Sequence, residues 1–222
     1  LTGDVHWLFN ILIVLSMTLA GLWWAFGEGD QAFVNLVKKA LLIGFFAFVI
    51  TNWDGLLKAI SQTFVALGLK AGGSVLTIAD FFTPSRVAEQ GIDLATNFFD
   101  QVQILSGPIS FFLNIENITI LLIAGLVTIV AFGIIAIQIL MAIIEFKLVT
   151  LAGFVMIPWG IFSKTAWMVE RPLGYVVSSG LKLLVLALVI SISSAVFAQL
   201  QPSPEPTMNE AVSVMLGSLA LL

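Results

Sequence analysis

Long uncharged stretches alternate with short charged breaks along this chain. Residues 7–26 carry no charge and have tryptophan at both ends, which matches the length of a bilayer core and the aromatic belts at its surfaces. After a hydrophilic break at residues 27–30, the chain turns apolar again from residue 32 to residue 53, past Lys38 and Lys39. Because long lysine side chains reach the headgroups from within a helix, this stretch predicts a second span.

A third stretch, residues 118–144, is uncharged and corresponds to about 40 Å of helix, enough to cross a bilayer with some tilt. The charged residues of Glu145-Phe146-Lys147 interrupt it, and residues 148–162 are apolar again. We expect Pro158 to kink that fourth span near its end, because proline cannot donate a helical hydrogen bond.

Residues 173–198 form the last long apolar stretch, in which Gly174 and Ser178 have the four-residue spacing that lets membrane helices approach closely. A proline-rich linker at 201–206 and a short apolar tail follow. The pattern therefore predicts an all-α polytopic integral membrane protein, with about five transmembrane helices plus amphipathic extramembrane helices.

Charges return between residues 54 and 117, and the apolar positions there follow a helical period. One predicted surface or half-inserted helix carries the stripe Leu57, Ile60, Phe64 and Leu67. A second predicted helix begins at Thr83 as N-cap, with Pro84 at the favoured first position, and ends before Ser106-Gly107-Pro108. The chain accordingly divides into a two-span region (1–53), a central extramembrane region (54–117), a three-span core (118–200) and a linker with its tail (201–222).

The second of these helices is amphipathic, and its two faces leave two interpretations open. Its apolar stripe is Val87, Leu94, Phe98, Val102 and Leu105, with acidic and amide residues opposite. The helix either lies on the membrane or its own bundle, or offers a docking surface to an extramembrane partner. The docking interpretation rests on Glu89, Asp93, Phe98 and Asp100.

Composition supports the membrane interpretation and excludes several classes of site. Hydrophobic residues make up 59% of the chain and charged residues 10%, with a mean hydropathy of +1.10, more apolar surface than one soluble core would hide. Cysteine is absent and His6 is the only histidine, so we expect no thiolate chemistry, no metal cluster, no cofactor and no catalytic residues. The net charge of −4 argues against strong binding of nucleic acid by this chain.

Gly27-Glu28-Gly29-Asp30 fits the GxGD pattern of intramembrane aspartyl proteases. That chemistry needs a second aspartate at bilayer depth, and no predicted span contains one, so we interpret the motif as a hydrophilic turn.

Four polar residues within or between the predicted spans are candidates for function: Lys182, Gln138, Glu145 and Lys147. Lys182 lies near the middle of the last span, where a charge is costly and usually faces a bundle interior or water. It either lines a pore or pairs with a carboxylate such as Glu145 to hold helices together, and the sequence leaves both open.

The chain resembles the TrbL proteins of conjugation systems over nearly its whole length. The resemblance is strongest in EFKLVTLA (145–152), IPWG (157–160), SKT (163–165) and ERPLGYVV (170–177), with Ser179-Gly180 and Lys182. It extends to WWAF (23–26), the two lysines before IGFFA (43–47), FTPS (82–85) and GIDLA (91–95).

This resemblance implies a channel or platform subunit in the bacterial inner membrane, part of a type IV secretion system that supports conjugative DNA transfer and pilus assembly. It implies a ring of subunits, with five as the expected number, beneath a stalk of minor pilus protein. Other implied partners are further inner-membrane secretion components, membrane lipid, and transiting single-stranded DNA or protein. It implies a periplasmic N-terminus and a large central periplasmic region at about residues 54–117. Removal of a secretory signal before Leu1 would agree with the periplasmic N-terminus.

A membrane subunit of a small-molecule transporter is the alternative. Such a subunit should show broken helices and substrate-sized polar groups at the midplane, and only Lys182 and Gln138 approach that.

Overall fold

Helices account for all the regular structure in the part of the chain that the computed structural model describes, namely residues 2–26, 30–73, 76–108, 110–162, 164–199, 212–213 and 216–217. The predicted turn at residues 27–29, the proline-rich linker and most of the apolar tail lie outside these residues. The helices are α1 (Thr2–Phe26), α2 (Asp30–Thr51), α3 (Trp53–Ala71), α4 (Ile78–Phe81), α5 (Pro84–Leu105), α6 (Ser110–Leu113), α7 (Ile115–Met156), the 3₁₀ helix η1 (Ile157–Ile161) and α8 (Trp167–Gln199).

The predicted all-α polytopic membrane fold is confirmed. Among the described residues, four helical segments are long and apolar enough to cross a membrane: Thr2–Leu22, Phe33–Thr51, Ile115–Ile161 and Trp167–Ala195. The span predicted past Lys38 and Lys39 is present, and the Lys39 ammonium lies 5.5 Å from the centre of the Phe162 ring. The structure therefore has four candidate spans where the sequence pattern suggested about five.

The difference arises at Glu145-Phe146-Lys147, where the predicted break does not exist. The α7 helix runs unbroken through these residues, because Phe146 is buried while the two charged side chains are exposed, and Glu and Lys are good helix formers. Its 42 residues correspond to about 63 Å, roughly twice the thickness of a bilayer core. Pro158 acts as predicted, since the α-helix ends at Met156 and gives way to η1.

The helices form two compact units that do not follow the order of the chain. One consists of Leu1–Ser61 with Glu145–Gly180, and the other of Gln62–Ile144 with Leu181–Leu222. In the first unit, α1 packs against α2 and η1. Its apolar cluster takes Val5, Phe9 and Leu12 from α1, and extends to Ile43, Phe46, Ile50, Trp53, Phe154, Ile157, Ile161 and Val169.

In the second unit, α3 and α8 run parallel and touch through small residues. A Cβ at Gly68 would lie 2.8 Å from the Cβ of Ala187, and one at Gly72 would collide with the Ser191 side chain. The Ser191 hydroxyl donates a hydrogen bond to the Leu69 carbonyl at 3.0 Å. Small residues four apart on both helices allow this close approach, which is how membrane helices associate without water exclusion.

The apolar stripe predicted on α3 was wrong by about one position. Leu67 is 52% exposed, whereas Val65 and Leu69, together with Ser61 and Gly68, are buried. The contact is made by glycine and serine rather than by the largest apolar side chains.

Gly174 and Ser178, the small-residue pair predicted from the sequence, are not packed against another helix in the part of the chain that the structure describes. Both are exposed, and a Cβ at Gly174 would meet nothing within 4 Å.

A short capped turn leads into α5. The Thr77 hydroxyl donates to Asp80 Oδ2 at 2.6 Å, the Thr77 amide donates to the same oxygen at 3.0 Å, and the Asp80 amide donates to Thr77 Oγ1 at 3.2 Å. These bonds from Thr77, the hydroxyl first, hold the pKa of Asp80 below its ordinary value. The stabilisation is therefore present at neutral pH and is lost as the pH falls through that lowered pKa.

The predicted start and end of α5 are confirmed, with Thr83 as N-cap residue and Pro84 at the first position. Its buried face is Val87, Gly91, Ala95 and Phe98. The predicted stripe had Leu94 where the structure buries Gly91 and Ala95, and Leu94 itself is only half-buried.

The α3–α8 contact predicts which glycine tolerates a larger side chain. Gly68→Leu should lower stability by about 2 kcal/mol, because overpacking a filled contact forces the two helices apart. The matched control is Gly44→Leu on α2, because Gly44 is exposed and a side chain there enters open space and should change little. Thermal aggregation midpoints of the purified variants in mild detergent give the comparison. Equal losses in both variants would contradict the contact.

Candidate functional site

The four intramembrane polar candidates are all exposed, but they point to different places. Gln138 and Glu145 are two turns apart on α7 and share one side of that helix. Lys147 follows Glu145 by two residues and therefore points to nearly the opposite side, where it lines a pocket. Lys182 lies in the other compact unit, on α8. Its predicted pairing with Glu145 joins residues of both units and stays a prediction.

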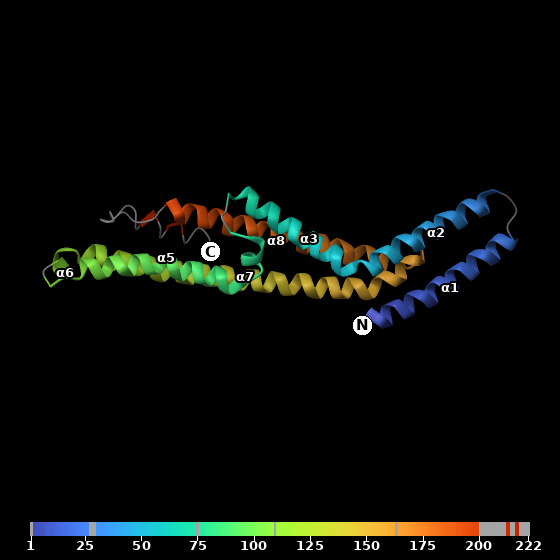
Figure 1. The fold of residues 1–222 in the computed structure, drawn as a ribbon, viewed down its shortest axis with the longest axis horizontal. Helices are drawn as coiled ribbons and strands as arrows, with labels where there is room; N and C mark the ends of the chain where they lie inside the picture. Colours follow the sequence, from blue (N-terminus) through green and yellow to red (C-terminus); the bar gives the residue numbers. More distant parts are fainter. Residues whose placement is uncertain are drawn as a thin grey trace. The chain divides into compact units, whose positions relative to one another are not determined.

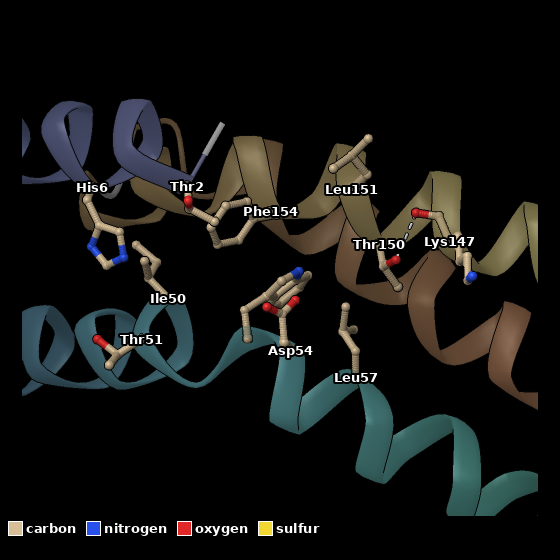
Figure 2. Close-up of a pocket in the computed structure, with 11 residues that line it drawn as sticks. Thr2, His6, Ile50, Thr51, Asp54, Leu57, Lys147, Thr150, Leu151 and Phe154 are labelled. Atoms are coloured by element: carbon tan, nitrogen blue, oxygen red, sulfur yellow. Dashed lines mark hydrogen bonds between the residues drawn. The ribbon is translucent and has the colours of Figure 1, made fainter.

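The pocket that contains Lys147 lies in the first unit and has a volume of about 300 Å³. Four helices contribute to it (Figure 2). Its lining consists of Thr2, His6, Ile50, Thr51, Trp53, Asp54, Leu57, Lys147, Thr150, Leu151 and Phe154.

The local sequence explains why these side chains meet. Thr2 and His6 are one turn apart on α1, while Lys147, Thr150 and Phe154 follow a helical period on α7. Asn52 separates α2 from α3: its amide side chain donates to the Phe48 carbonyl at 3.0 Å, and its own carbonyl accepts from the Leu56 amide at 2.9 Å. The chain changes direction between Thr51 and Asp54, as Figure 2 shows, and the first turn of α3 places Asp54 at the pocket.

The pocket has an apolar floor and a polar rim. Ile50, Trp53 and Phe154 are buried, and the rings of Trp53 and Phe154 have their centres 5.8 Å apart. Thr2, His6, Thr51, Asp54 and Lys147 are exposed and form the polar part of the lining.

This chemistry suits the binding of a polar group rather than a reaction. The Thr150 hydroxyl donates to the Lys147 carbonyl at 2.9 Å, so it is held by the backbone and not by a base. Over the described ranges, no three His, Cys, Asp or Glu side chains come together as metal ligands would.

Two of the pocket residues were missed by sequence reasoning. From the sequence, His6 is notable only as the single histidine of the chain, and residue 54 only as the start of the central region. The signal was present, because each flanks an apolar stretch and two consecutive spans return the chain to the same membrane surface.

The residues predicted to dock a partner lie on α5 with mixed exposure. Glu89, Asp93 and Asp100 are exposed, and Glu89 Oε2 lies 3.4 Å from Arg86 Nη1. Phe98 is 4% exposed and packs inside its own unit, so in this structure it is not offered to a partner.

Comparison with known proteins decides the family. Residues 13–222 match the TrbL/VirB6 plasmid conjugal transfer protein family. The chain belongs to the TrbL/VirB6 family. The predicted resemblance to TrbL proteins is thereby confirmed.

Two curated relatives support the assignment. A probable conjugal transfer protein TrbL of Sinorhizobium fredii (strain NBRC 101917 / NGR234) is 28% identical over 210 residues, covering 94% of this chain and 50% of the relative. The conjugal transfer protein TrbL of Rhizobium radiobacter is 27% identical over 212 residues, with the same coverage of 94% and 50%. The chain thus spans about half the length of these relatives. No solved structure matches it significantly.

The TrbL/VirB6 match begins at residue 13, so it contains the α2, α3 and α7 sides of the pocket but neither Thr2 nor His6. The pocket floor and the rim residues Thr51, Asp54 and Lys147 therefore lie within the family region.

The floor gives a test of this packing. Phe154→Ala should lower stability by about 3 kcal/mol, because it leaves a void beside Trp53 that the apolar cluster cannot fill. Leu151→Ala on the same helix is the control, since Leu151 is 51% exposed and loses fewer contacts. Thermal denaturation in detergent, followed by tryptophan fluorescence, measures both. The packing shown here is wrong if Leu151→Ala is the more damaging change.

Proposed function

We propose that this chain is the inner-membrane channel or platform component of a conjugative type IV secretion system. The observation that carries the proposal is the TrbL/VirB6 match over residues 13–222, together with four candidate membrane spans among the described residues. Energy for transfer comes from other components, because the sequence has no GxxxxGK[ST] phosphate-binding loop.

The partners follow from family membership. Copies of the chain assemble into a ring, for which we propose five subunits, and the ring carries a stalk of minor pilus protein and contacts other inner-membrane components. The exposed face of α8 around Gly174, Ser178 and Tyr175 is available for contacts between copies. Single-stranded DNA or protein is the substrate that the secretion system as a whole transports.

The proposed orientation places the N-terminus in the periplasm. The α1 and α2 helices are consecutive candidate spans, and so Thr2 and Asp54 lie on the same side of the membrane. The pocket that both residues line then opens toward the periplasmic surface.

A strain lacking the gene tests the function itself. Deletion should abolish conjugative transfer to a recipient, and the wild-type gene supplied from a plasmid should restore it. The matched measurement is uptake of small solutes by the same strains. Normal transfer with a defect in uptake would favour the small-molecule transporter and overturn the proposal.

Lys182 gives the sharpest test of mechanism. If it pairs with Glu145, Lys182→Gln leaves a carboxylate without its partner and should reduce the amount of assembled protein, while adding Glu145→Gln should restore most of it. If Lys182 faces water instead, Lys182→Gln should leave assembly intact and change transfer frequency. Assembled protein and transfer frequency are measured in the same strains.

A Lys182→Gln strain that is normal in both measurements would show that the side chain simply reaches the headgroups. It would exclude both functional roles for Lys182.

A further inference from the structure

In the second compact unit, α5 and the first part of α7 lie side by side, and their exposed faces differ in polarity (Figure 1). A Cβ at Gly91 would lie 2.7 Å from Cγ of Phe132, and one at Gly125 would lie 2.7 Å from Cε1 of Phe99. Since the higher number on α5 meets the lower number on α7, the pair is antiparallel. The amide of Gln90 also donates to the Ser194 hydroxyl at 3.0 Å, which ties α5 to α8.

The exposed face of α7 is apolar at this level. Its exposed side chains between residues 122 and 138 are Leu122, Ile123, Leu126, Val130, Ile134 and Ile137, six apolar groups in succession, followed by the amide of Gln138. The segment belongs to the candidate span of highest mean hydropathy, 3.0. Exposure of such a continuous apolar surface to water is unfavourable, so we expect this face to lie against lipid.

The exposed face of α5 is polar over the same length. Between residues 85 and 104 it consists of Ser85, Arg86, Glu89, Asp93, Thr96, Asn97, Asp100 and Gln103, with Ile92 and Ile104 as the apolar exceptions. Three carboxylates and one guanidinium are present, and the 22 residues of α5 correspond to about 33 Å, close to the thickness of a bilayer core.

The register brings these faces to one level. Gly91 lies against Phe132 and Phe99 against Gly125, which places Asn97 beside the level of Leu126 and Glu89 beside that of Ile134. Where α7 meets lipid, α5 therefore presents charges at the same depth. Charged side chains at that depth face a bundle interior or a water-filled cavity.

Contrary to the expectation that residues 54–117 are extramembrane, we propose that α5 lies within the bilayer in the assembled protein and lines a water-filled path with its polar face, while α7 separates that path from lipid. The inference rests on the proposed function, because only an assembly of several copies encloses such a path. With three carboxylates against one guanidinium in each copy, the path admits cations and opposes anions, nucleic acid included. This region then conducts water and cations rather than DNA.

Nitroxide labels on this cysteine-free chain test the proposal. Asn97→Cys and Leu126→Cys are exposed, level-matched positions on the two helices, and Glu89→Cys with Ile134→Cys is a second pair if either variant accumulates poorly. Each full-length variant is labelled, reconstituted as the oligomer, and exposed to oxygen, which enriches in lipid, and to neutral nickel ethylenediaminediacetate, which stays in water.

The α5 label should collide mainly with nickel and the α7 label mainly with oxygen. Nickel access at Leu126→Cys would show that α7 lies in water, and low access to both reagents there would show that protein covers it. Exclusion of nickel from Asn97→Cys would show a dry α5 face. Any of these three results overturns the proposal.

The charge of the path is tested with anionic chromium oxalate at the Asn97→Cys label. Chromium oxalate should be excluded relative to neutral nickel, and replacing both Asp93 and Asp100 with Asn should raise its access roughly two- to fivefold. Unchanged access would overturn the acidic lining.

Transfer frequency of the same variants separates this inference from the proposed function. If the gene is required for conjugation but the labels disagree with the expected pattern, only the water-filled path fails. If the labels agree but deletion leaves transfer intact, the role in secretion fails instead.

Discussion

A polar side chain inside a bilayer must reach water or a polar partner, whereas an apolar side chain there needs neither. This constraint accounts for where the described charges of the chain lie. The exposed surface of α7 from Leu122 to Ile137 is apolar, and the carboxylates at the same level lie on α5. In the first unit, His6, Asp54 and Lys147 line one pocket with a floor of aromatic and aliphatic side chains.

Because apolar burial gives little advantage between helices that already lie in lipid, close packing must hold them together. Small residues provide it, with Gly68 and Gly72 meeting Ala187 and Ser191, and Gly91 and Gly125 receiving the rings of Phe132 and Phe99. The contacts also set the register of α5 along α7, and hence which polar residue lies at which depth. The same small-residue contacts therefore hold the helices together and set the level at which the polar face of α5 lies along the apolar face of α7.

Much of the fold was predictable, because length and charge alone identify α1 and α2, and Thr83-Pro84 identifies the start of α5. The break at Glu145 was wrong, since two exposed charges on an otherwise apolar helix cost no helical hydrogen bond. The α3 contact and the pocket escaped prediction for another reason. Gly68 matters only because Ala187 lies against it, and His6 matters only because Asp54 and Lys147 line the same pocket. The periodicity of one segment does not predict which distant segment packs against it.

The position of the lipid belt along α7 tests the central claim most directly. Electron cryomicroscopy of the assembled protein in lipid nanodiscs resolves both the belt and the helices that it surrounds. The account predicts lipid density against Leu122, Leu126, Val130 and Ile134, with α5 on the side away from lipid and facing solvent. Lipid density centred on residues 145–161, with α5 projecting into bulk solvent, would contradict it.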